Sequence, residues 1–135
     1  MSLDQLPEWD TVLGLQFENL VLNNVTPLAR LLRLERTPLL AASPYIQKPT
    51  ARKRGCQIDL ILRTKNALYV VEIKRRKSID VTVVDEVREK VLRLPSVRSQ
   101  SVRTALVYEG KLDPRVETEG YFDFLIPFAR LLEGT

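Results

Sequence analysis

Two apolar stretches between residues 55 and 74 have the hydrophobic pattern of β-strands, and each is interrupted by one carboxylate. Asp59 interrupts the first stretch and Glu72 the second, among Ile, Leu and Val residues. Lys65-Asn66 lies between them and predicts a two-residue turn, because Asn tolerates a positive φ. A charge inside a buried strand is costly unless something pairs with it. The hairpin therefore poses the question of what stabilises its two carboxylates.

The predicted turn fixes the register of the two strands. Thr64 pairs with Ala67, which places Asp59 directly opposite Glu72. Lys74 shares a face with Glu72, because strand side chains alternate with a period of two. Like charges directly opposite each other destabilise a sheet, so the pair of carboxylates predicts a cation between them. Two carboxylates form a hard oxygen site, which favours Mg²⁺ or Mn²⁺.

The other periodic segments alternate between helices and strands, which predicts an α/β fold with a mixed central sheet. At 135 residues the chain is expected to form a single domain, residues 1–135. Helices are expected at about 8–24, 28–34, 81–94 and 127–132, and further strands around 45–47, 102–108 and 121–126. The strand around 45–47 is placed at a sheet edge, because prolines flank it. Residues 109–120 are expected to be a polar connection.

Glu18 lies in the middle of the apolar face of the first predicted helix. At about 100° per residue, Gly14, Val21 and Val25 fall on the same side. The pattern leaves two interpretations open. Glu18 is either a core residue paired with an arginine or a third oxygen donor beside the hairpin carboxylates. The backbone carbonyl of Ile73 is a candidate for a further oxygen donor.

Glu86 and Lys90 lie four residues apart on the predicted helix 81–94 and form an (i, i+4) pair. The apolar stripe of that helix consists of Val83, Val84, Val87, Val91 and Leu94. The helix pattern favours a solvent-exposed ion pair for Glu86 and Lys90.

The charge of the chain is unevenly distributed. The net charge is only +4, but ten of the 21 basic residues and two of the 17 acidic residues lie between Lys48 and Lys77. A focused basic segment is typical of proteins that bind a polyanion such as nucleic acid. The candidate nucleic-acid-binding residues are Lys48, Arg52, Lys53, Arg54, Arg75, Arg76 and Lys77.

Several classes of function are excluded by missing residues. The chain has no histidine, which excludes Ser-His-Asp and Cys-His catalysis and histidine-containing zinc sites. It also has no Gly-x-x-x-x-Gly-Lys-Ser/Thr loop for ATP. The single cysteine, Cys56, cannot form an intrachain disulfide and is expected to be a small buried apolar residue, which fits a cytoplasmic location. No apolar run is long enough to predict a membrane span.

The segment Gly55 to Asp59, followed by Glu72-Ile73-Lys74, resembles the Asp…Glu-x-Lys core of the PD-(D/E)XK nuclease superfamily. The resemblance extends from Trp9 to Leu132, and Ile58 stands where some members carry a proline before the aspartate. It implies a restriction-endonuclease-like αβββαβ core. More closely, Gly14 to Leu20 and the two hairpin strands resemble the C-terminal domain of a group of prokaryotic P-loop (AAA-type) ATPases. The chain is therefore expected to be one domain of a longer ATPase.

The resemblance implies an Mg²⁺-dependent DNA endonuclease in which Mn²⁺ substitutes. Asp59, Glu72 and Glu18 would bind the metal, and Lys74 would orient the attacking water or stabilise the developing negative charge. Gln57 and Glu86 would be auxiliary polar residues. Because related nucleases often dimerise to cut two strands, a homodimer is also implied. Two alternatives stay open: a catalytically silent DNA-binding or scaffold module of an ATPase, and a structural network in which basic residues neutralise the carboxylates.

Overall fold

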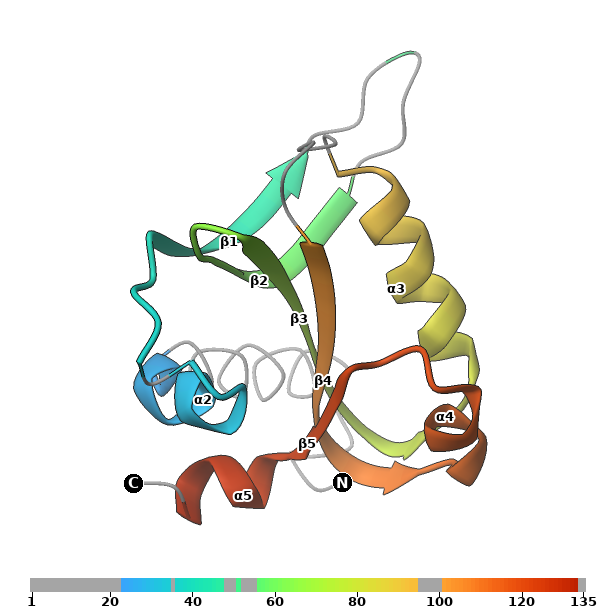
Figure 1. Ribbon diagram of the computed structural model, residues 1–135. Helices are drawn as coiled ribbons and strands as arrows, with labels where there is room; N and C mark the ends of the chain where they lie inside the picture. The colour runs from blue at the N-terminus through green and yellow to red at the C-terminus, as the bar shows by residue number, and fades with distance from the viewer. Residues whose placement is uncertain (1–22, 35, 48–50, 52–55, 95–100, 134–135) are drawn as a thin grey trace, which may run out of the picture.

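The computed structural model describes residues 23–34, 36–47, 51, 56–94 and 101–133. A five-stranded sheet in the order β1-β2-β3-β4-β5 forms its centre (Figure 1). The strands are β1 (Ala41–Gln47), β2 (Cys56–Arg63), β3 (Ala67–Ile79), β4 (Ser101–Leu112) and β5 (Phe124–Pro127). The first three strands pair antiparallel, whereas β3, β4 and β5 pair parallel. The predicted α/β fold with a mixed central sheet is confirmed.

Helices cover both faces of this sheet. The described helices are α2 (Val25–Leu31), α3 (Thr82–Leu92), α4 (Pro114–Glu119) and α5 (Phe128–Glu133). α3 and α4 lie on one side of the sheet, and α2 and α5 lie on the other (Figure 1). α3 is the crossover that the parallel pair β3 and β4 requires. The order is thus a meander, a crossover helix and a further strand, as the resemblance implies. None of the described helices is both long and apolar enough to cross a membrane.

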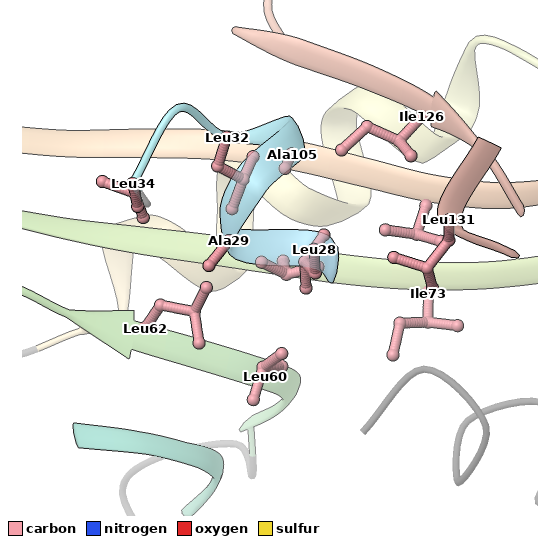
Figure 2. Close-up of a cluster of buried hydrophobic side chains, with 12 residues drawn as sticks. Leu28, Ala29, Leu32, Leu34, Leu60, Leu62, Ile73, Ala105, Ile126 and Leu131 are labelled. Atoms are coloured by element: carbon pink, nitrogen blue, oxygen red, sulfur yellow. The ribbon is translucent and has the colours of Figure 1, made fainter. Parts of the chain in front are cut away.

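The sheet divides the core into two apolar layers. Figure 2 shows the layer on the α2 and α5 side, where Leu28 and Leu131 pack in one cluster with Leu62 of the sheet. On the other side, Val87 of α3 packs with Leu106 of β4. Because both faces are covered, the central strands need apolar side chains on both sides, which explains the nearly continuous apolar runs in the sequence.

The side chains of β3 alternate between the two layers. Val71 and Ile73 belong to the α2–α5 layer, and Val70 packs with Val91 of α3. Glu72 therefore projects toward α3, on the same face as Val70. The period of two in a strand thus directs this carboxylate away from one apolar layer and toward the crossover helix.

The predicted hairpin turn is confirmed. β2 ends at Arg63 and β3 begins at Ala67. The Thr64 N–H donates to the Ala67 carbonyl at 2.9 Å, and the Thr64 hydroxyl oxygen accepts from the Ala67 N–H at 3.0 Å. The side-chain hydrogen bond of Thr64 helps to close the Lys65-Asn66 turn, which lacks the glycine of an Asn-Gly turn.

The predicted register holds for four residue pairs and ends just before the carboxylates. The β2–β3 ladder runs from Arg63–Leu68 to Leu60–Val71. The next pair in this register would be Asp59 and Glu72, but the ladder does not include them. The two strands therefore separate where the charged side chains begin.

A β-bulge in β2 lies at the same place. The β1–β2 pairs on either side of it are Ser43–Ile61 and Tyr45–Ile58. Between these pairs, Pro44 alone faces two residues, Asp59 and Leu60. Pro44 has no N–H to donate to the ladder, and a bulge re-aims the side chain of the inserted residue. The bulge explains how Asp59 leaves the regular alternation of the strand.

β3 continues to Ile79, beyond the hairpin strand that the hydrophobic pattern predicts. Its last part pairs with β4 through a register shift between Arg75 and Ser78. Gly110 of β4 lies at this shift with φ +132°, and a Cβ atom there would be 1.7 Å from the Arg76 carbonyl oxygen. The irregular pairing therefore requires glycine at this position.

Other element boundaries differ from the expectations. α2 begins at Val25 and contains Pro27, because proline is tolerated in a first turn where its missing N–H is not needed. Residues 109–120 are not simply a polar connection: β4 extends to Leu112, and α4 follows with Asp113 as its N-cap. The first predicted helix, 8–24, lies outside the described residues except for its last two positions, which form a turn.

Candidate active site

Glu72 is a buried carboxylate whose two oxygens have different surroundings. Its side chain is only 2% exposed. Its Oε1 atom accepts a hydrogen bond from Lys90 Nζ at 2.7 Å, and Lys74 Nζ lies 3.6 Å from the same oxygen. Its other oxygen, Oε2, is buried and has no hydrogen-bond partner in the part of the chain that the structure describes. A buried acceptor without a partner is costly, so Oε2 is an atom to which a cation would be attracted.

Asp59 lies beside Glu72 where the strands separate. Its Oδ2 atom accepts a hydrogen bond from the backbone N–H of Ile73 at 2.9 Å. This bond attaches the Asp59 side chain to the backbone of β3, one residue after Glu72. It replaces the backbone hydrogen bond that a continued β2–β3 pairing would make at this position. The bulge and this hydrogen bond together bring the two acidic side chains to one place.

The pKa of Glu72 responds to burial and to the neighbouring Asp59 carboxylate. Burial raises the pKa of Glu72 above its ordinary value, and the negative charge of Asp59 raises it further. The hydrogen bond and charge of Lys90 act in the opposite direction, as does the charge of Lys74, but they do not fully offset it. Two lysines therefore only partly neutralise this acidic pair, and an additional cation would stabilise it.

Lys74 is held between two carboxylates. It shares the α3-facing side of β3 with Glu72, as the strand period predicts. Its Nζ atom lies 3.3 Å from Oε2 of Glu86 on α3, and 3.6 Å from Glu72. The Lys74 side chain is 15% exposed and that of Glu86 is 41% exposed, so this part of the site opens toward solvent. Glu86 thus lies next to Lys74, and its auxiliary role stays a prediction.

Lys90 lies beside Glu72, a contact that the pattern of the helix did not predict. The favoured interpretation of Glu86 and Lys90, a solvent-exposed ion pair, is wrong, because the two side chains contact Lys74 and Glu72 of β3. A signal was present in the spacing: Glu86 and Lys90 follow Val83 by three and seven residues, so they share its buried face.

The remaining predicted residues fall into two groups. Arg75, Arg76 and Lys77 are exposed along β3, and Gln57 is exposed on β2. Glu18, Lys48, Arg52, Lys53 and Arg54 lie outside the described residues. Ile73 contributes its N–H to the site through Asp59. The structure therefore describes Asp59, Glu72, Lys74 and Glu86 together, and leaves the position of Glu18 as a prediction.

The residues present fit a divalent cation in the chemistry of their donors. Asp59 and the free Oε2 atom of Glu72 offer hard oxygen donors, and Mg²⁺ is usually held by one or two carboxylates and water. In the described part of the chain, no group of three Asp, Glu, Cys or His side chains could hold a metal. A third protein carboxylate would have to come from residues outside that part.

Comparisons with known proteins find similarity to a solved structure. No family model and no curated protein matches the chain. A search of solved structures finds similarity to the crystal structure of a repair endonuclease from Pyrococcus abyssi, with 25% sequence identity and a TM-score of 0.45. The match covers 80% of this chain and 42% of the endonuclease chain. The chain therefore spans less than half the length of that endonuclease.

Proposed function

We propose that this chain is a metal-dependent nuclease domain that hydrolyses phosphodiester bonds in DNA. The observation that carries the proposal is the meeting of Asp59 and Glu72 at the point where β2 and β3 separate, with Glu72 Oε2 buried and unpartnered. Lys74 lies beside the same carboxylates. A carboxylate pair, a neighbouring lysine and a solvent-accessible side are the components that phosphodiester hydrolysis requires.

Each residue has a separate role in this proposal. Asp59 and Glu72 would hold Mg²⁺ or Mn²⁺, with Glu18 and the Ile73 carbonyl completing the donor set. The metal, when bound, lowers the pKa of a coordinated water and offsets negative charge on the phosphate. Lys74 orients the attacking water or stabilises the negative charge that develops on the phosphate oxygens. Glu86 keeps the ammonium group of Lys74 in place through their 3.3 Å contact.

The basic residues around the hairpin would bind the phosphate backbone of the substrate. Arg75, Arg76 and Lys77 are exposed on β3 directly after the site. Lys48, Arg52, Lys53 and Arg54 would extend the same surface. Contacts of this kind position a nucleic acid without reading its sequence. We therefore propose DNA as the substrate, bound mainly through its phosphates and with strong salt dependence.

The wider context is also a proposal, supported by the sequence resemblance. We propose that the domain is cytoplasmic and works next to a P-loop ATPase domain in the same polypeptide. A homodimer would place two sites on the two strands of a duplex. Sedimentation of the chain with and without a DNA duplex measures the mass of the complex and so tests this proposal. A homodimer predicts two protomers on one duplex.

Cleavage of plasmid and branched DNA in the presence of Mg²⁺ or Mn²⁺ tests the proposed activity. We expect cleavage by the wild-type chain, and its loss in Asp59→Ala and Lys74→Ala. Lys65→Met is a matched control, because Lys65 is exposed in the hairpin turn away from the carboxylates. Absence of cleavage, or cleavage that persists in both site variants, would contradict the proposal.

A second function is a catalytically silent DNA-binding or scaffold module. The observation that favours it is the 2.7 Å contact between Lys90 and Glu72, because a lysine already neutralises part of the carboxylate pair. DNA binding with a steep salt dependence, together with no calorimetric binding of Mn²⁺, would support this function over the nuclease.

A further inference from the structure

Two lysines from different elements approach the same oxygen of Glu72. Lys90 comes from α3 and lies 2.7 Å from Oε1, while Lys74 comes from β3 and lies 3.6 Å away. Lys74 is closer to Glu86, at 3.3 Å, than to Glu72. The short, hydrogen-bonded contact of Glu72 is therefore made by Lys90, and Lys74 is shared between two carboxylates.

We propose that Lys90 is a positioning residue, which holds Oε1 of Glu72 so that Oε2 is presented as the metal ligand. This inference rests on the proposed nuclease function and assigns a role that the Asp…Glu-x-Lys pattern does not contain. With Lys90 engaged on Glu72, Lys74 is available for the water or the phosphate. The two lysines thus divide two tasks, the orientation of a ligand and the stabilisation of charge.

The position of Lys90 on α3 suits this role. Val83 and Val87, on the same side of the helix, are completely buried against the sheet. A lysine on a helix anchored in this way approaches Glu72 from a fixed direction. Partners that orient metal ligands from a rigid element keep the donor atoms in the geometry that binding needs. Lys74 lies on the same strand as Glu72, so it does not approach the carboxylate from a separate rigid element.

Binding of Mn²⁺ to the full chain, measured by calorimetry, tests the inference without reference to cleavage. We expect Lys90→Met to weaken Mn²⁺ binding about tenfold to a hundredfold, as loss of an outer partner of a metal ligand usually does. Lys90→Arg keeps a charged donor and should recover part of the affinity. Lys65→Met removes the same charge at the hairpin turn and should leave the affinity unchanged.

A variant that keeps the site folded adds a second measurement. Lys90→Gln retains an uncharged N–H donor on a side chain one bond shorter, so it should bind Mn²⁺ with an affinity between those of the wild type and Lys90→Met. Circular dichroism before each titration identifies variants that are not folded. If Lys90→Met is unfolded, the comparison of Lys90→Gln with the wild type decides the question.

The direction in which the Mn²⁺ affinity changes in Lys90→Met shows whether Lys90 positions Glu72 or competes with the cation. A lysine that merely occupies the place of the cation would block it, so Lys90→Met would then bind Mn²⁺ more tightly. Unchanged or tighter binding in Lys90→Met and Lys90→Gln overturns the positioning role but leaves the nuclease proposal intact. If the wild-type chain binds no Mn²⁺, both the inference and the nuclease proposal are overturned.

Discussion

The two halves of β3 differ in pairing and in composition. Residues 67–71 have β4 on one edge and β2 on the other, and they carry no charge. Residues 72–79 pair with β4, and the β2–β3 ladder does not reach them. This second half contains Glu72, Lys74, Arg75, Arg76 and Lys77. The boundary between the halves falls at Val71–Glu72, where β2 leaves the strand.

The comparison shows how one strand can serve both the core and a site. Where β3 has two neighbours, its side chains are covered on both faces and must be apolar. Where β2 turns away at the bulge, the Ile73 N–H is bonded by the Asp59 carboxylate. The carboxylate at position 72 is then met by two lysines. Because β2 no longer pairs with β3 at this point, charged side chains can be accommodated in the second half of β3.

The largest expected change in stability comes from introducing a carboxylate at position 71, the last residue of the first half of β3. Val71 is completely buried in the α2–α5 layer, where it packs among apolar side chains. We expect Val71→Glu to lose at least about 4 kcal/mol of unfolding free energy, because an unpaired charge would be buried. Urea denaturation followed by circular dichroism measures the loss. Val102→Glu on β4, at 44% exposure, is the control and should change stability by less than about 1 kcal/mol.

The second half of β3 depends on Gly110 of the neighbouring strand. We expect Gly110→Ala to cost about 3 kcal/mol, because its φ of +132° is unfavourable for alanine and the Cβ would collide with the Arg76 carbonyl. Gly120→Ala is a matched control, since Gly120 has φ +66° but no atom within 4 Å of the added Cβ. We expect it to cost about 1 kcal/mol. Equal losses in thermal unfolding would show that the irregular β3–β4 pairing is not tightly constrained.

The charge of Glu72 should give the stability a specific pH dependence. Because the folded-state pKa of Glu72 is raised above its ordinary value of 4.5, the folded chain binds this proton more tightly than the unfolded chain does. The contribution of Glu72 to stability therefore falls as pH rises from about 4.5 through the folded-state pKa. Glu72→Gln removes this fall and keeps an oxygen that can accept from Lys90.

At pH 7 we expect Glu72→Gln to be slightly more stable than the wild type, because burial and the Asp59 charge disfavour the ionised form of Glu72. The difference should become small below pH 4. Urea denaturation of both proteins between pH 4 and pH 8 measures it. A Glu72→Gln protein that is less stable at pH 7 would mean that the two lysines fully compensate the buried charge.

The smallest effect is expected at the exposed end of β3. Arg75 Nε lies 3.7 Å from Oε2 of Glu109, and their side chains are 40% and 53% exposed. Ion pairs in solvent contribute little, so Glu109→Gln should change the unfolding free energy by less than about 0.5 kcal/mol. A loss above about 1 kcal/mol in urea denaturation would show that this pair also holds the irregular β3–β4 region together.

The features that local sequence determines were predictable. The Lys65-Asn66 turn fixed the register of the hairpin, and alternation correctly placed Glu72 and Lys74 on one face of β3. The apolar stripe of α3 predicted a helix that packs on the sheet. The mixed α/β class followed from the order of these elements. All these features depend on residues that are close in sequence.

The features that depend on distant residues were not predictable. The bulge at Asp59 arises opposite Pro44, on a neighbouring strand, so no signal within β2 marks it. The spacing from Val83 places Lys90 on the sheet-facing side of α3, but its contact with Glu72 depends on how α3 is rotated above the sheet, which the apolar stripe fixes only approximately. The extension of β3 through a run of basic residues depends on pairing with β4. Tertiary pairing overrides local propensity in these places.

The most direct test of the account is a crystal of the full chain soaked with Mn²⁺ and measured for anomalous scattering. The account predicts a peak between the Asp59 carboxylate and Glu72 Oε2, with Lys90 still bonded to Oε1. It also predicts that Glu18 faces this peak, directly or through water. The absence of a peak between Asp59 and Glu72, with lysines bonded to both oxygens of Glu72, would contradict the metal site and the function proposed from it.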